Sequence, residues 1–523
     1  MKKTLALFLA VLMIAALFVG CDSSSSGNHN YNDFSDNTND DPLLGTPGHY
    51  DYGDRFKGIT IRIAIQGEFT GDEWFFKKCE EVIGCEIELL CFGGAATYTE
   101  KVNAMLATGD IPDLFQPVVA ISEINTYGDQ GAFVNLMDPN VLDRMPNFKA
   151  VYYDNKENYD LYMRTASPTG AHYCIPHYES SRNVNHGWMY RDDVFAELGL
   201  EWKGDLDGFL NNLRALKKAY PDSYPMAGAA WEDTLNRWCY SFNTNDQYTA
   251  YNWETGKWYI GADSEDYYTM LKTLQTMYNE KLMDPDFLTN TGTGAIDAAI
   301  INDKSFVFHS WIGRMDVQNS NADLLAKEGH VSPAAPVGTN GKGIELVKFV
   351  AHGGSAIANN ANREATMALV NWLYDNTPGG GGYCISVGAE GETFNWVDGK
   401  KVYIGLEDVK VVTIQDLTNE FGMWEPVLYY RMNHDHNIYF EFTEEEQLAQ
   451  DIGDAAGYYK AVPPFPVVDT RINDLKASMT TDIQSFVQKF VTQNLTRADY
   501  DAFIADLHNR YDDVIDAYNA SEN

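Results

Sequence analysis

The chain has 523 residues, with 75 Asp and Glu against 38 Lys and Arg, and its formal net charge is −37. This charge argues against nucleic acid or anionic lipid as the main partner, because binding to phosphate depends on Lys and Arg. The chain is also longer than the roughly 250–300 residues at which one hydrophobic core stops growing, so at least two lobes are expected.

The N-terminal segment predicts a signal peptide. Two lysines precede an apolar run over residues 5–19, which is shorter than the roughly 20 residues of a membrane-spanning helix. Residues 17–21, LFVGC, resemble a lipobox, with Phe18 in the place of the usual Leu. We therefore expect residues 1–20 to be cleaved and Cys21 to carry a lipid that anchors the exported protein to the outer face of the cell membrane. The alternative is ordinary cleavage beside an incidental Cys.

A polar stretch follows this segment. Residues 22–53 are rich in Ser, Asn, Asp, Gly and Tyr and contain almost no aliphatic side chains. Such a composition cannot bury enough apolar surface to offset the entropy lost on ordering. The sequence therefore predicts a disordered lipoprotein tether over 21–55.

Alternating strands and helices follow the tether. Spacing and composition predict strands over 59–65, 86–92 and from 111, with helices over 71–84 and 97–108 between them. After residue 176 we expect strands over 188–190, 305–309 and 345–358, and helices over 192–198, 206–219, 263–281, 362–374, 474–491 and 497–518, with Thr496 as an N-cap. Strands alternating with helices indicate an α/β fold.

The remaining cysteines favour free thiols over a disulfide framework. Cys79 falls in a predicted helix, and Cys85 and Cys91 share one face of a predicted strand, which is typical of small buried residues. No CxxC or Cys/His spacing indicates a zinc site, so no cofactor is expected.

Five stretches carry a family resemblance. In chain order they are 101–114 (KVNAMLATGDIPDL), 190–200 (YRDDVFAELGL), 256–261 (GKWYIG), 278–287 (YNEKLMDPDF) and 394–400 (FNWVDGK). They are similar to a helix ending in ASGDxPD, and to YRKDWLxKLGL, GKWxYG, YxEGLIDPEF and TWVDGKP. Together they resemble the family 1 extracellular solute-binding proteins, in the lipoprotein branch of LipO-like and alginate-binding proteins.

The resemblance implies a two-lobed periplasmic-binding-protein-like fold with a hinge and an interlobe cleft. By this analogy the first lobe comprises 56–176 and 331–390, and the second comprises 177–330 and 391–523. It also implies a monomeric solute-binding component of an ABC importer, with permease subunits as partners. A neutral oligosaccharide is the expected ligand, and a peptide or a small vitamin-like molecule is the alternative. The calcium loop of the alginate-binding branch has no counterpart in residues 217–226, which lack its Asp and Asn run. No metal is therefore expected.

Sugar sites combine aromatic faces with planar polar side chains. Gln66, Glu68 and Phe69 follow the first strand, and ligands of open α/β sheets bind beyond the carboxyl ends of strands. Asp113 resembles a family position near the cleft, although it also fits a turn cap. These residues are candidates for ligand binding.

Five further aromatic and basic residues complete the set. Trp231 follows a predicted strand over 226–230, and Trp311 and Arg314 follow a predicted strand over 306–309, so they are expected in loops. Trp424 and Arg431 belong to an irregular aromatic segment, and they could line the same cleft or pack between the lobes.

An enzyme is the main alternative class. Paired carboxylates build glycosidase sites, but with 75 acidic residues such pairs arise by chance. Residues 338–343 lack the spacing of a phosphate loop and are expected to form a hairpin loop, and no GxSxG or HExxH occurs. His434 and His436 suit a solvated surface better than a metal site. A ligand-presenting lipoprotein that serves a membrane kinase stays open as a third class.

Overall fold

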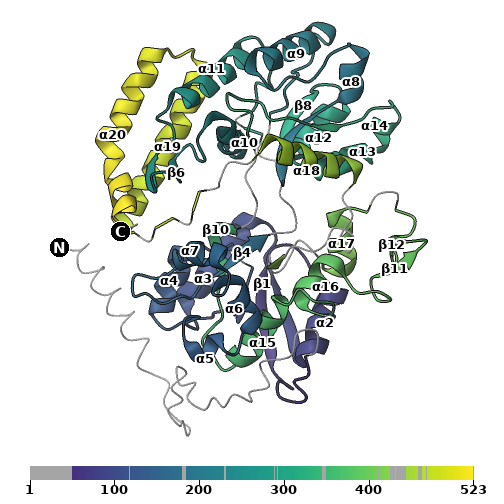
Figure 1. Ribbon diagram of the computed structural model, residues 1–523, viewed down its shortest axis with the longest axis vertical. Coiled ribbons are helices and arrows are strands. Elements are labelled where there is room, and N and C mark those ends of the chain that lie inside the picture. The colour runs from purple at the N-terminus through teal and green to yellow at the C-terminus, as the bar shows by residue number, and fades with distance from the viewer. Residues whose placement is uncertain are drawn as a thin grey trace, which may run out of the picture. The chain divides into compact units, whose positions relative to one another are not determined.

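The structure is a computed structural model, and Figure 1 shows its course. It describes residues 50–116, 118–179, 184–228, 231–287, 289–290, 293–343, 349–409, 412–423, 430–431, 443–457, 462–463, 465–466 and 468–521. The predicted signal peptide, most of the predicted tether and Trp424 lie outside these ranges. Residues 39–523 form one compact unit, and all of the elements below belong to it.

Three parallel strands form the first sheet, in the order β2-β1-β3. They are β1 (Thr60–Ile65), β2 (Glu86–Cys91) and β3 (Leu114–Phe115), joined through α2 (Trp74–Ile83) and α3 (Ala95–Thr108). Alternation along β1 places Ala64 in a cluster with Tyr98 of α3 and turns Ile63 to the opposite face. Both helices end at a glycine with positive φ, Gly84 at 76° and Gly109 at 78°. The predicted order of strands and helices is confirmed here.

A second, mixed sheet has the order β10-β4-β13. Its strands are β4 (Ile175–Glu179), β10 (Phe349–Ser355) and β13 (Tyr430–Arg431). The sheet meets the first one where Val119 bridges Gly354 and where the Phe115 N–H donates to Ser355 Oγ at 3.3 Å. A Cβ on Gly354 would lie 2.3 Å from the sulfur of Cys174, so this close approach requires glycine.

Helices surround these two sheets. They are α4 (Ile121–Asp129), α5 (Pro139–Leu142), α6 (Pro146–Tyr152), α7 (Lys156–Met163), α15 (Arg363–Leu373), α16 (Gly381–Val387) and α17 (Ile414–Phe421), beside the hairpin of β11 (Phe394–Val397) and β12 (Lys400–Tyr403). The helices α2, α15 and α16 pack against one another, and α17 packs on α2 (Figure 1). Stacking of Tyr152 on Tyr162 at 4.7 Å ties α6 to α7.

A third sheet, antiparallel, has the order β8-β5-β9. Its strands are β5 (His186–Tyr190), β8 (Val307–Trp311) and β9 (Ser332–Ala334). One face packs Trp188 against Phe209 and Trp238, and the other packs Met189 with Met315. Its period-2 alternation thus separates two apolar clusters.

The elements around this sheet are mainly helical. They are α8 (Asp192–Glu197), α9 (Leu206–Ala219), α10 (Trp231–Trp238), η2 (Cys239–Phe242), β6 (Thr249–Asn252), β7 (Lys257–Ile260), α11 (Glu265–Asn279), α12 (Thr293–Ile301), α13 (Arg314–Asn319), α14 (Ala322–Leu325), α18 (Glu444–Ala456), α19 (Thr470–Thr492) and α20 (Arg497–Ala520). The two C-terminal helices pack on each other, and α19 also packs on α11. Thr496 caps α20 in a capping box with Asp499, so its predicted N-cap role is confirmed.

The packing shifts two segments relative to the predicted lobe boundaries. β9 pairs with β5, although residues 331–390 were assigned to the first lobe. The segment from β11 through α17 packs beside α2, although residues 391–523 were assigned to the second. On these contacts we propose a first lobe of 56–179 and 349–431 and a second lobe of 184–343 and 443–521.

Three chain passes then join the two lobes. They run from Glu179 to Val184, from Gly343 to Phe349, and from Arg431 to Thr443. Residues 338–343 follow β9 and precede β10, which are strands of different sheets, so the predicted hairpin loop is wrong. A hairpin loop would require β9 and β10 to pair with each other, and local sequence does not encode which strands pair.

Candidate ligand-binding site

The three passes leave the first lobe at one edge of the sheet β10-β4-β13. The chain departs after Glu179 of β4 and after Arg431 of β13, and these two residues are paired in register. It enters β10 at Phe349, which pairs with Tyr178. We call this the first-lobe crossing edge. The backbone of Arg431, one of the predicted ligand residues, therefore lies on it.

The carboxyl end of β1 points toward the same edge. β1 is parallel to β3, and the segment after β3 runs antiparallel to β10 at the Val119–Gly354 bridge. Because β10 starts at the first-lobe crossing edge, the residues that follow β1 and β3 lie toward that edge. Glu68 is exposed there, as expected for a ligand residue.

Phe69 and Gln66, by contrast, make contacts inside the lobe. The ring of Phe69 is half-buried and meets Phe76 edge-on at 5.7 Å. The Gln66 N–H donates to Gln116 Oε1 at 2.8 Å. These contacts hold the loop that presents Glu68.

The second lobe has a corresponding edge. β5 begins at His186, where the first pass arrives, and the antiparallel β8 ends at Trp311, its partner in register. The indole of Trp311 is 47% exposed, and its centroid lies 5.3 Å from the buried His186 ring. We call this the second-lobe crossing edge. Trp311 is the last residue of a strand, so its predicted place in a loop is wrong.

The same face of β8 continues into the lobe interior. His309 lies two residues before Trp311, and its ring meets Trp188 at 5.4 Å. Burial, helped by the charge of Arg237, lowers the pKa of His309 to about 3. This imidazole is therefore neutral at physiological pH. Trp231 begins α10, the helix whose Trp238 packs on this face, and does not lie in the predicted loop.

Arg314 also differs from its predicted loop position. It is the first residue of α13, and its guanidinium lies 3.1 Å from Asp297 Oδ2 of α12, with both side chains mostly buried. This ion pair joins two helices of the second lobe and favours a structural role. Among the predicted residues whose side chains the structure describes, Glu68 and Trp311 are therefore the two that are exposed at the crossing edges.

Comparison with known proteins identifies the family. The family model described as bacterial extracellular solute-binding protein matches residues 84–379, more than half of the chain. The chain belongs to this family. Comparison of this solute-binding protein with curated proteins gives no match.

Solved structures show the fold. The alginate-binding protein AlgQ2, without calcium ion, is 17% identical with a TM-score of 0.69, covering 89% of this chain and 98% of its own. An HMO-binding, ABC-transporter-associated protein from Bifidobacterium longum infantis is 17% identical, with a TM-score of 0.66 and coverage of 88% and 98%. The S. pneumoniae ABC-transporter substrate-binding protein FusA, in complex with kestose, is 17% identical, with a TM-score of 0.67 and coverage of 89% and 99%. The predicted two-lobed periplasmic-binding-protein-like fold is confirmed.

Asp113 lies inside the first lobe of this solute-binding protein. Its buried carboxylate accepts from the Arg62 N–H at 2.8 Å and from the side-chain amides of Asn360 at 2.6 Å and Asn362 at 3.3 Å. These bonds tie β1 to the segment that precedes α15. The arrangement favours the structural alternative for Asp113.

We therefore expect Asp113→Ala to lower the free energy of unfolding by about 2 kcal/mol, because three partly buried donors lose a charged acceptor. Urea unfolding of the ligand-free protein measures this. Asp113→Asn keeps one acceptor oxygen, so its free energy of unfolding should fall less than that of Asp113→Ala. Unchanged unfolding together with lost ligand binding would instead make Asp113 a ligand residue.

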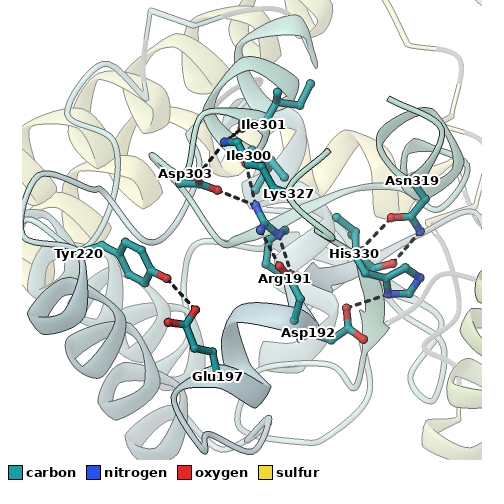
Figure 2. A network of polar contacts seen from close by, with 12 residues as sticks. Arg191, Asp192, Glu197, Tyr220, Ile300, Ile301, Asp303, Asn319, Lys327 and His330 are labelled. Carbon is teal, nitrogen blue, oxygen red and sulfur yellow. Dashed lines mark hydrogen bonds and ion pairs between the residues drawn. The ribbon is translucent and has the colours of Figure 1, made fainter. Parts of the chain in front are cut away.

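The segment that resembles the family's YRKDW motif also has a structural role. Arg191 is 3% exposed and forks onto Asp193, with Nε 2.7 Å from Oδ1 and Nη2 2.6 Å from Oδ2. Its Nη1 donates to Asp303 Oδ1 at 2.9 Å and to the Ile300 carbonyl at 3.1 Å, as Figure 2 shows. Lys327 closes the network on Asp303 at 2.7 Å. Arg191 thus fastens α8 to the end of α12.

The described residues contain no group of three or more His, Cys, Asp or Glu placed to hold a metal ion. Within the same ranges, no helix combines the length and apolar composition of a membrane span. The six cysteines that the structure describes are free thiols. The family is one of binding proteins rather than enzymes.

His186 is the residue at this edge that sequence reasoning missed. Its only sequence signal is a position at the start of a strand, 125 residues before Trp311 (311 − 186). The contact between the two rings arises from antiparallel pairing, which the local pattern does not specify.

Proposed function

We propose that this chain is the lipid-anchored solute-binding component of an ABC importer and that it captures an oligosaccharide between its two lobes. Permease subunits would receive the ligand. Members of the family bind solutes, which supports capture without chemical conversion.

The observation that carries the proposal is the pair of crossing edges. Glu68 lies at the edge of one lobe and Trp311 at the edge of the other, and the chain passes between the lobes at these edges. A ligand held there would meet a carboxylate from one side and an indole face from the other. Closure about the three passes would then enclose it.

Three considerations favour a neutral oligosaccharide. Exposed indole faces suit the CH patches of pyranose rings. Similar structures are described as binding alginate, HMO or kestose, and NgtS of Streptococcus pneumoniae as binding Man5GlcNAc. A formal charge of −37 weighs against a polyuronate such as alginate.

Thermal-shift screening tests the proposal. The purified protein is heated with kestose, milk oligosaccharides, Man5GlcNAc and alginate oligosaccharides in turn. At a hundredfold excess over its Kd, a true ligand stabilises the folded state by about 2.7 kcal/mol. We expect a neutral sugar to produce this shift. A shift with alginate alone would refute the neutral ligand, and no shift with any sugar would refute sugar capture.

The proposed anchor at Cys21 makes a separate prediction. In cells, Cys21→Ala should move the protein from the membrane fraction to the soluble exported fraction, because the thiol that accepts the lipid is gone. Fractionation and mass spectrometry of the N-terminal peptide measure this. Cys174→Ala is the control, since that thiol is buried in the first lobe. Unchanged membrane association of the Cys21 variant would exclude the lipid anchor.

A further inference from the structure

An arginine of the first lobe contacts a tyrosine of the second lobe. Arg164, which follows α7, donates from Nη2 to the hydroxyl of Tyr251 at 3.3 Å, and its Cζ lies 5.4 Å from the centroid of that ring. Tyr251 belongs to β6, and 87 residues separate the two positions. The guanidinium therefore bonds the phenol oxygen and also lies within cation–π distance of the ring.

The described elements pack mostly within their own lobe. Every pair of described elements that packs extensively, from β1 with β2 to α19 with α20, lies within one of the two lobes. The lobes are therefore held together mainly by the three passes and by contacts between individual side chains. The bond from Arg164 to Tyr251 is such a contact.

The backbone beside Arg164 is fixed within the first lobe. Tyr162 and Thr165 are fully buried, and the Thr165 hydroxyl donates to the Tyr162 carbonyl at 2.7 Å. The side-chain amide of Asn125, on α4, donates to the Thr165 carbonyl at 3.1 Å. Arg164 itself is only partly buried. Its guanidinium thus extends from a rigid base.

Tyr251 is held as firmly within the second lobe. It is 4% exposed, and its ring meets the rings of Trp253 and Trp258 edge-on, each at 5.0 Å. Its N–H donates to Asn245 Oδ1 at 2.9 Å, and its carbonyl accepts from Asn245 Nδ2 at 2.8 Å. The hydroxyl therefore has little freedom to follow Arg164 when the lobes move.

On the first-lobe side, the contact lies away from the first pass. Tyr162, two residues before Arg164, donates its hydroxyl to the Cys174 carbonyl at 3.2 Å. Cys174 immediately precedes β4, whereas the first pass leaves after Glu179 at the other end, so about 15 Å of strand separates them. Rotation about the passes therefore changes the distance between Arg164 and Tyr251, and a hydrogen bond of 3.3 Å tolerates little lengthening.

We propose that Arg164 and Tyr251 form an interlobe latch, which favours the present arrangement of the lobes before any ligand is bound. Each end is fixed within its own lobe, so the contact resists separation of the lobes instead of following it. The inference rests on the proposed function, because a latch that favours closure in advance raises the apparent affinity for the captured ligand.

Pulsed electron spin resonance of the whole ligand-free protein tests the latch. Spin labels are attached through a ketone-bearing amino acid in the place of Ala107 on α3 and of Ala505 on α20, two exposed alanines in different lobes. This chemistry leaves the native thiols unlabelled. The distances between the labels give the ratio of open to closed molecules.

Two substitutions remove the contact from its two ends. Tyr251→Phe removes the accepting hydroxyl and keeps the ring, so the ratio of open to closed molecules should rise about fivefold. Arg164→Met removes the cation as well, and the ratio should rise about tenfold. The double variant should match Arg164→Met, because the contact is already lost in that variant.

Tyr220→Phe is the matched control. The Tyr220 hydroxyl donates to Glu197 Oε2 at 3.2 Å inside the second lobe, as Figure 2 shows, so this variant should keep the wild-type ratio. An unchanged ratio in either single variant, a further rise in the double variant, or a rise in Tyr220→Phe would each overturn the proposal. The measurement needs no sugar, so its failure would refute the latch alone, and a failed sugar screen would refute the proposed function alone.

Discussion

Replacing Arg191 with methionine is expected to lower the free energy of unfolding by about 3 kcal/mol. Methionine fills similar space but leaves Asp193, Asp303 and the Ile300 carbonyl without the guanidinium that bonds all three. Urea unfolding of the ligand-free protein measures the loss. The free energy of unfolding of Arg191→Lys should lie between those of the wild type and Arg191→Met, because lysine keeps the charge but not the planar fork.

Arg214 provides a control of the same geometry at the surface. It forks onto Glu280 with bonds of 2.6 and 2.7 Å, but its side chain is 43% exposed. Solvent-exposed pairs contribute about 0–1 kcal/mol, so Arg214→Met should cost no more than that. Equal losses for the two methionine variants would show that burial of the Arg191 fork is not what stabilises the fold.

Trp311→Ala should abolish the thermal shift produced by the sugar that the screen identifies. The indole is the exposed aromatic face at the second-lobe crossing edge, and truncation to a methyl group removes it. Stability without ligand should change by less than about 1 kcal/mol, because the ring is half exposed. Trp311→Phe keeps an aromatic face and should restore part of the shift.

Trp396→Ala is the matched control for this prediction. Trp396 is 40% exposed, but it lies on the β11–β12 hairpin of the first lobe. Its variant should retain the full shift. A retained shift in the Trp311 variant would remove that residue from the site, and a loss confined to the Trp396 variant would place the sugar at the hairpin.

Local sequence patterns determined most of the elements and the family of this protein. The β-branched alternation before residue 66 and the glycines that end α2 and α3 act within a few residues, so β1, α2, β2 and α3 could be predicted. The same holds for the capping box at Thr496, which starts α20. The order of short motifs along the chain predicted the two-lobed fold, which the comparisons confirm.

Only the tertiary structure decided which segments meet. β9 pairs with β5, and the segment from β11 to α17 packs beside α2, because strands and helices choose partners far away in the chain. The pairing of His186 with Trp311 and the burial of Asp113 have the same origin. Whether a Trp or an Asp meets solvent or a distant amide depends on contacts made after the chain folds. Local propensity acts over a few residues and therefore does not specify those contacts.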